Sequence, residues 1–144
     1  MPADANAAAA LCEGLDASCR VPLGDGGGVE AVLATLDVNR GATLPAEELS
    51  GTRGGSSSRA YLSNVSVAPG ARRRGLAAAL IRTAEARAAA AGVRHLYVHC
   101  VADNAPAATL YAAAGFAVEA EETAAEAHAL SRPRRLLFHK QPAL

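Results

Sequence analysis

The stretch YLSNVSVAPGARRRGLAA, residues 61–78, decides the fold. Its first part is rich in β-branched and apolar residues, which predicts a strand, and Pro69-Gly70 ends that strand because proline lacks a backbone donor. A basic loop, residues 72–75, follows, and strong helix formers begin at Leu76. A strand, a basic loop and a helix in this order bring guanidinium groups, backbone N–H groups and a helix N-terminus together. The stretch therefore predicts a binding site for an anionic ligand.

Further strands and helices are expected on both sides of this stretch. Runs of β-branched and large apolar residues predict strands over residues 29–38, 59–67, 93–101, 116–120 and 135–139. Helix formers predict helices over residues 76–91 and 105–114, which Gly92 and Gly115 would end. Asp103 or Asn104 would cap the second helix. The order of these elements indicates a mixed α/β fold with helices covering a central sheet.

The length of the chain, 144 residues, favours one domain with one core. Residues 1–28 are rich in Ala, Gly and Asp, so we expect a flexible or incomplete N-terminal lead-in to a domain over residues 29–144. Hydrophobic residues make up 51% of the chain. Because no apolar run reaches the roughly 18 to 20 residues that cross a bilayer, no membrane span is expected.

Composition argues against nucleic acid, metal and disulfide chemistry. The formal net charge is zero and aromatic residues make up only 3%, so a nucleic-acid-binding module is not expected. Residues 59–144 contain eleven Arg and Lys against six Asp and Glu, with a focus at residues 72–74, which suits an anion of limited size. Cys12, Cys19 and Cys100 form no CxxC pair, so we expect reduced thiols in an intracellular compartment and no metal site.

Two motifs overlap the expected helices. The basic loop has neither GxxxxGK[ST] nor GxGxxG, which weakens the nucleoside triphosphate and dinucleotide interpretations. Instead, the pattern [QR]-x-x-G-x-[GA] is matched by Arg72, Gly75 and Ala77. A second pattern, N-x-x-A-x-x-L-Y-x-x-x-G-F, is matched by Asn104, Ala107, Leu110, Tyr111, Gly115 and Phe116. On these two ordered motifs, the sequence resembles the GNAT superfamily of N-acetyltransferases.

More narrowly, LDVNRGATLPAEELSG, RAYLSNVSVAP and LSRPRRLLF resemble the plastid GNAT acetyltransferases of plants and green algae. The resemblance covers residues 30–140 and implies the GNAT-type acyl-CoA N-acyltransferase fold, here without the N-terminal strand and helices that family members have. It implies acetyl-CoA as the acetyl donor and a protein lysine or N-terminus as the acceptor, reached by direct nucleophilic attack. It also implies a chloroplast location, although no clear transit peptide is visible; the alternative is cytoplasmic.

The resemblance also implies roles for particular residues. The pantetheine arm of acetyl-CoA would lie along Val65, Ser66 and Val67. The motif residue Arg72 precedes the diphosphate-binding residues, which would be Arg73, Arg74, Gly75, Leu76, Ala77 and Ala78. The far side of the cofactor would meet Asn104, Ala105 and Pro106. Tyr111 would lie by the thioester sulfur as general acid, since a well-placed phenol with a pKa of about 10 can protonate a thiolate with a pKa of roughly 8.5.

The general base and the acceptor are left open by the sequence. Many relatives have a Glu on the strand equivalent to residues 60–67, where this chain has no acid, so His99 or an ordered water chain are the candidates. The competing functions are a small-molecule amine N-acetyltransferase and a non-catalytic CoA-binding module. Arg132, Arg134 and Arg135 are expected to face solvent.

Overall fold

The computed structural model describes residues 20–22, 29–40 and 56–143. The strands are β1 (Arg20–Pro22), β2 (Val29–Ala31), β3 (Ala34–Arg40), β4 (Arg59–Val67), β5 (His95–Val101), β6 (Ala117–Glu121) and β7 (Arg135–Lys140). The helices are α3 (Leu76–Ala90), α4 (Ala105–Ala113) and α5 (Ala124–Ala129), with 3-10 turns at Ser56–Ser58 and Pro69–Ala71. Most of the expected lead-in, residues 1–28, lies outside the described residues, and β1 within it was not predicted.

Five strands form the central sheet in the order β3-β4-β5-β7-β6. β4 and β5 are parallel, and the other neighbouring pairs are antiparallel. The sequence predicted residues 29–38 as one strand, but the structure divides this segment: β2 pairs with β1, whereas β3 joins the central sheet. The mixed α/β prediction is confirmed.

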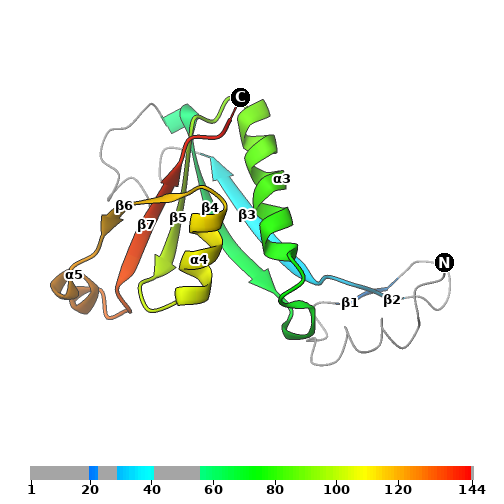
Figure 1. Ribbon diagram of the computed structural model, residues 1–144, viewed down its shortest axis with the longest axis horizontal. Coiled ribbons are helices and arrows are strands. Elements are labelled where there is room, and N and C mark those ends of the chain that lie inside the picture. The colour runs from blue at the N-terminus through cyan, green and yellow to red at the C-terminus, as the bar shows by residue number, and fades with distance from the viewer. Residues whose placement is uncertain (1–19, 23–28, 41–55, 144) are drawn as a thin grey trace.

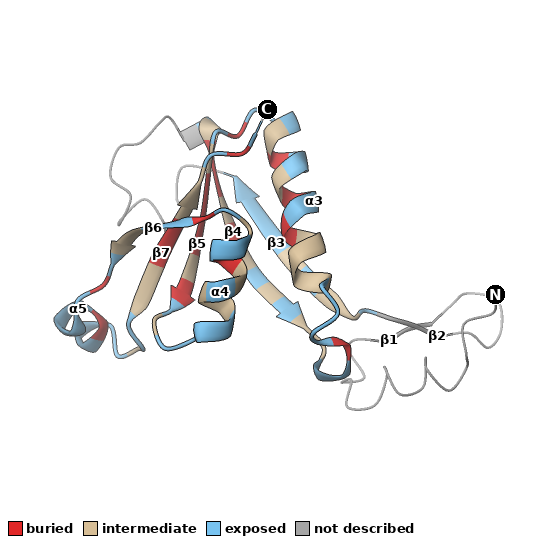
Figure 2. Ribbon diagram, in the orientation of Figure 1, coloured by how far each residue is buried: buried red, intermediate tan, exposed pale blue. Residues whose placement is uncertain are grey.

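Helices α3 and α4 cover the same face of the sheet (Figure 1). The main core lies beneath them and contains Ile81, Ala84 and Ala88 of α3 and Tyr111 of α4, packed against Leu62, Leu96, Val98 and Phe138 of the strands. Buried residues concentrate in the middle of the sheet and on the inward side of α3 (Figure 2). Because small alanines let α3 approach the sheet closely, few large apolar side chains are sufficient to fill this core.

The residues at the helix ends explain where the helices begin and end. Gly92 and Gly115 follow α3 and α4 with φ of 80° and 86°, a backbone conformation that glycine adopts without steric cost. The Asn104 side chain caps α4 by accepting a hydrogen bond from the Ala107 N–H at 3.1 Å. These two helices were predicted within a residue of their observed ends. The short α5 was not predicted, although Thr123 and Glu126 form a capping box at its start.

The opposite face of the sheet carries a second, smaller cluster of Tyr97 and Leu137, both fully buried. Beside it, Glu122 is only 3% exposed and accepts hydrogen bonds from Arg132 and Arg135. The expectation that Arg132 and Arg135 face solvent is therefore wrong, because a buried carboxylate requires their charges and donors nearby. Arg134 is exposed and pairs with Glu121 at the surface. In the described part of the chain, no helix has the length and apolar character to cross a membrane.

Candidate functional site

The site begins where β4 and β5 separate. Their parallel pairing runs from Arg59–His95 to Leu62–Val98 and then stops, although β4 continues to Val67 and β5 to Val101. The two strands diverge beyond this point (Figure 1). The β5-facing backbone groups of residues 63–67 therefore have no ladder partner, and a ligand with its own amide groups can pair with them.

A β-bulge at Asn64 turns the end of β4. The register against β3 shifts between Thr35 and Asp37, and Asn64 has a φ of 51°. Its side chain donates to Asp37 Oδ2 at 2.6 Å, which holds the bulge. Before the bulge Leu62 is buried in the core, and after it Val65 is half-buried at the mouth of the gap. The bulge therefore re-aims the strand toward the space beside α3.

The basic loop presents backbone donors at the start of α3. Arg73 and Gly75 both have positive φ, 63° and 77°, and Gly75 is the N-cap without a side-chain cap. The first N–H groups of a helix have no intrahelical partner, so those of residues 76–78 point out toward the loop. Arg72 donates from Nε to the Val67 carbonyl at 3.1 Å, which ties the loop to the end of β4. Backbone donors, a helix N-terminus and the guanidinium of Arg73 together favour an anion.

A cavity of about 700 Å³ connects these features. Of the predicted cofactor residues, it is lined by Val65, Ser66, Val67, Arg72, Arg73, Gly75, Leu76, Ala77, Ala78, Asn104 and Pro106. Arg74 and Ala105 are exposed and are not among its lining residues. Ala71, Ala107 and Leu110 line it but were not predicted, although Ala107 and Leu110 belong to the second motif. Residues 40 positions apart in sequence thus share one cavity.

Tyr111 lies at the inner end of this cavity. Its side chain is 6% exposed and packs against the rings of Phe116 and Phe138, with centroids at 6.0 and 5.7 Å. Among the described residues, none forms a hydrogen bond with the Tyr111 hydroxyl. Burial, assisted by the neighbouring Cys100 and Tyr61, raises the pKa of Tyr111 to about 12. Tyr111 is therefore a neutral phenol with a hydrogen available for a ligand.

A second cavity, of about 420 Å³, lies in the gap between β4 and β5. It shares Val65, Asn104, Ala107 and Tyr111 with the first cavity. Tyr61 and His99 line it from β4 and β5, and the buried Cys100 contributes a thiol whose pKa is raised by burial. Because the Tyr111 side chain borders both cavities, two ligands could meet beside it.

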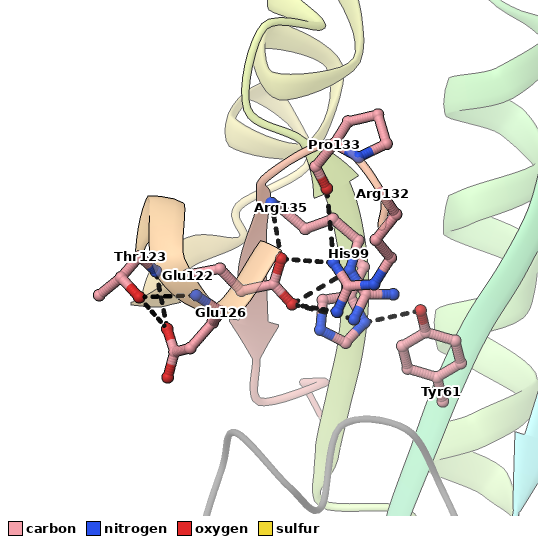
Figure 3. Close-up of polar contacts among 8 residues, drawn as sticks. All are labelled: Tyr61, His99, Glu122, Thr123, Glu126, Arg132, Pro133 and Arg135. Carbon is pink, nitrogen blue, oxygen red and sulfur yellow. Dashed lines mark hydrogen bonds and ion pairs between the residues drawn. The ribbon is translucent and has the colours of Figure 1, made fainter. Parts of the chain in front are cut away.

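His99 is a neutral imidazole that is bonded to Tyr61. Nδ1 of His99 lies 2.8 Å from Oη of Tyr61, and Nε2 is buried without a hydrogen-bond partner (Figure 3). Burial lowers the pKa of His99 to about 4, and the charge of Arg135 adds to this effect, while Glu122 opposes it. Burial also raises the pKa of Tyr61. Both groups are uncharged at neutral pH.

Comparison with known proteins agrees with this geometry. The Acetyltransferase (GNAT) family model matches residues 33–116, which include β4, the basic loop, α3, β5 and α4. The chain belongs to this family. The GNAT resemblance inferred from the two sequence motifs is confirmed.

Two plant proteins share much of the GNAT sequence. GCN5-related N-acetyltransferase 7, chloroplastic, of Arabidopsis thaliana is 39% identical over 130 residues, covering 88% of this chain and 46% of the relative. GCN5-related N-acetyltransferase 6, chloroplastic, of the same plant is 33% identical over 101 residues, covering 62% of this chain and 35% of the relative. The chain therefore spans less than half the length of these curated relatives.

A solved structure confirms the GNAT fold. The structure of yncA from Salmonella typhimurium with its cofactor acetyl-CoA superposes with a TM-score of 0.61 at 16% identity, covering 78% of this chain and 60% of that chain. At this identity the likeness establishes the fold alone.

Proposed function

We propose that the protein transfers an acetyl group from acetyl-CoA to a primary amine. The observation that carries the proposal is the first cavity, which runs from the basic N-terminus of α3 along the unpaired part of β4 to Tyr111. Acetyl-CoA has an anionic diphosphate, then a pantetheine arm with amides, and then a reactive thioester. These three parts require the three environments in this order. Membership of the GNAT family supports the same conclusion.

The residues that are present fit acetyl-CoA. Gly75 has nothing within 4 Å of the position of an added Cβ, so the loop leaves open space where a phosphate would approach the backbone. Arg73 and the N–H groups of residues 75–78 would hold the diphosphate, and the free backbone groups of residues 65–67 would pair with the pantetheine amides. Arg74, which is exposed beside the cavity, would reach a phosphate only at its outer edge. Asn104 and Pro106 would close the far side.

Tyr111 is the proposed general acid. When bound, acetyl-CoA supplies an acetyl thioester, and the incoming amine forms the new C–N bond as the C–S bond breaks and the sulfur gains the electron pair. Tyr111 donates its hydrogen to that sulfur and regains one from water, to which the amine loses its own proton. A phenol with a pKa of about 12 is a weak acid, but the same dry surroundings also raise the pKa of a thiol, as they do for the adjacent Cys100. Burial therefore shifts the pKa of the Tyr111 hydroxyl and the pKa of a thiol in the same direction.

The proton of the amine is proposed to leave through water rather than to His99. With a pKa of about 4 and a buried Nε2, the imidazole binds a proton poorly at neutral pH. An amine that arrives uncharged, and loses its proton to water after attack, needs no strong base from the protein.

We take the acceptor to be a protein amine, either a lysine side chain or an N-terminus, and the location to be the chloroplast. The sequence resemblance to plastid GNAT proteins supports both choices, and the chloroplastic names of the two Arabidopsis relatives support the location. The runner-up functions are a small-molecule amine acetyltransferase and a CoA-binding module without turnover.

One experiment separates these functions. The purified chain is incubated with acetyl-CoA and three acceptors: a peptide with a free N-terminus and no lysine, an N-terminally blocked peptide with one lysine, and a polyamine mixture. Mass spectrometry then detects the addition of an acetyl group. Peptide acetylation is expected. Products from polyamines alone would favour the small-molecule enzyme, and acetyl-CoA binding without any product would contradict the proposal.

A further inference from the structure

Three polar side chains of β3 contact β4 at its bulge. Thr35, Asp37 and Asn39 alternate along β3, so they lie on one face of this strand. The Thr35 hydroxyl donates to the Asn64 carbonyl at 3.3 Å. Asp37 Oδ2 accepts a hydrogen bond from Asn64 Nδ2 at 2.6 Å, and Asn39 Nδ2 donates to Ser63 Oγ at 2.9 Å. All three side chains therefore hold the same two consecutive residues of β4.

The bulge determines which side chains of β4 face the helices. Ser63 and Ser66 both pair with β3, and β4 has two residues between them where β3 has only Leu36. Before the bulge Leu62 is buried beneath the helices, and after it Val65 is half-buried on the same side. Successive side chains of a strand point to opposite faces. Without the extra residue, Ser66 would face the helices and Val65 would face away from them.

The bulge also has a backbone cost. Asn64 has a φ of 51°, a conformation that residues other than glycine adopt rarely, although asparagine tolerates it better than most. A register without the bulge would relieve this strain. The contacts from Thr35 and Asp37 to Asn64 therefore favour the observed register over the one without a bulge.

We propose that Asp37 is a positioning residue for acetyl-CoA and acts through Asn64. This inference rests on the proposed function. Asp37, assisted by Thr35, holds the bulge, and the bulge directs the backbone groups of residues 65–67 toward the pantetheine arm. Asp37 is exposed and does not line the first cavity, so it acts without touching the cofactor.

This role makes a specific kinetic prediction. Loss of the Asp37 contact lowers the fraction of the chain that has the bulge, and the apparent Kd for acetyl-CoA rises as that fraction falls. The cofactor then associates more slowly but dissociates at the same rate, because the bound state is unchanged. Loss of a residue that touches the cofactor would instead speed dissociation.

The test measures acetyl-CoA binding to the full chain by calorimetry, with rates from surface plasmon resonance. We expect Asp37→Ala to raise the Kd about three- to tenfold, as for the loss of one hydrogen bond, entirely through the association rate. Asp37→Asn retains an acceptor oxygen, so its Kd should stay within about twofold of the wild type. Val38→Thr, at an exposed position on the other face of β3, is the matched control and should also stay within about twofold.

A double-mutant cycle checks that Asp37 acts through Asn64. Asn64→Gly removes the side-chain donor, but glycine adopts a φ of 51° without steric cost. Asp37→Ala should therefore have little further effect on the Kd in Asn64→Gly, and fully additive effects would overturn the inference. If Asp37→Ala does not fold, Thr35→Val replaces it: a raised Kd supports the inference, and an unchanged Kd overturns it.

The outcomes separate positioning from other roles and from the proposed function. Both substitutions at Asp37 remove a negative charge, so a purely electrostatic role would lower the Kd for the anionic cofactor in both variants. That result, an unchanged Kd in Asp37→Ala, or a faster dissociation rate would overturn the inference while acetyl transfer stands. A wild type that binds acetyl-CoA but acetylates no acceptor contradicts the proposed function, and the Kd values still decide the inference. A wild type that does not bind acetyl-CoA contradicts both.

Discussion

Replacing Glu122 with glutamine should destabilise the fold without impairing the chemistry. The carboxylate is 3% exposed and accepts two 2.5 Å hydrogen bonds from Arg132, together with the backbone N–H of Arg135 at 2.9 Å. These contacts hold the pKa of Glu122 at about 2, with the hydrogen bonds from Arg132 as the largest cause. Relative to about 4.3 in an unfolded chain, this is roughly two pKa units, or about 3 kcal/mol at 1.36 kcal/mol per unit.

The sign of this contribution fixes its pH dependence. The folded pKa lies below the unfolded one, so the stabilisation is fully present above pH ~4.3 and is lost as the pH falls toward 2. Urea unfolding of the wild type and Glu122→Gln should show a gap in the free energy of unfolding of about 3 kcal/mol at pH 7 that closes in acid. His99 is neutral at pH 7 in both proteins, so turnover below the melting temperature should be unchanged.

The neighbouring Glu121 provides the matched control. It pairs with Arg134 at the surface, where the two side chains are 53% and 44% exposed, so Glu121→Gln should cost less than about 1 kcal/mol. The reasoning would be refuted if Glu122→Gln lowered the free energy of unfolding no more than Glu121→Gln does. It would also be refuted if the loss in Glu122→Gln did not change with pH.

Three further predictions concern the proposed acetyl-CoA site. Arg73→Ala should raise the acetyl-CoA Kd, measured by calorimetry, by roughly 10- to 100-fold, because one charge-assisted contact is lost. Arg74→Ala should change this Kd less than about threefold. Equal effects of the two substitutions would contradict the assignment. Gly75→Val should abolish acetyl-CoA binding and lower stability by about 1 to 3 kcal/mol, because a β-branched residue is strained at φ 77°; normal binding would remove the loop from the site. Tyr111→Phe should lower kcat by about 10² to 10⁴ with the acetyl-CoA Kd within a few-fold, and unaltered turnover across pH 6 to 9 would leave Tyr111 a core aromatic.

Local chemistry made the two helices and four of the central strands predictable from sequence. Pro69, Gly92 and Gly115 end elements through backbone restrictions that act within a few residues, and Asn104 caps α4 in the same local way. The division of residues 29–38 into β2 and β3 was not predictable, because it depends on which distant strand each half pairs with. The α5 capping box at Thr123 and Glu126 was visible in the sequence, although it begins a helix of one to two turns with little hydrophobic periodicity.

In the candidate site, too, local sequence motifs predicted some residues, and tertiary contacts place the others. The cofactor side follows contiguous motifs, and most of the expected residues line the first cavity. Tyr61 has no sequence signal, because its position beside His99 arises from the parallel register of β4 and β5. The positions of Arg132 and Arg135 were missed for a similar reason: their partner, Glu122, is buried by tertiary contacts that no local pattern encodes.

The early end of the β4–β5 pairing also gives the sheet an internal edge. Unpaired strand edges are templates onto which another extended chain can add, and proteins ordinarily protect them. Here the edge lies in the middle of the sheet, between two strands that each pair with another strand on their other side, β4 with β3 apart from the bulge at Asn64, and β5 with β7. A ligand that pairs with residues 65–67 would therefore seal the sheet as well as position itself. By mass action it would also stabilise the folded chain, so ligand supply would control both turnover and the tendency of the empty protein to associate.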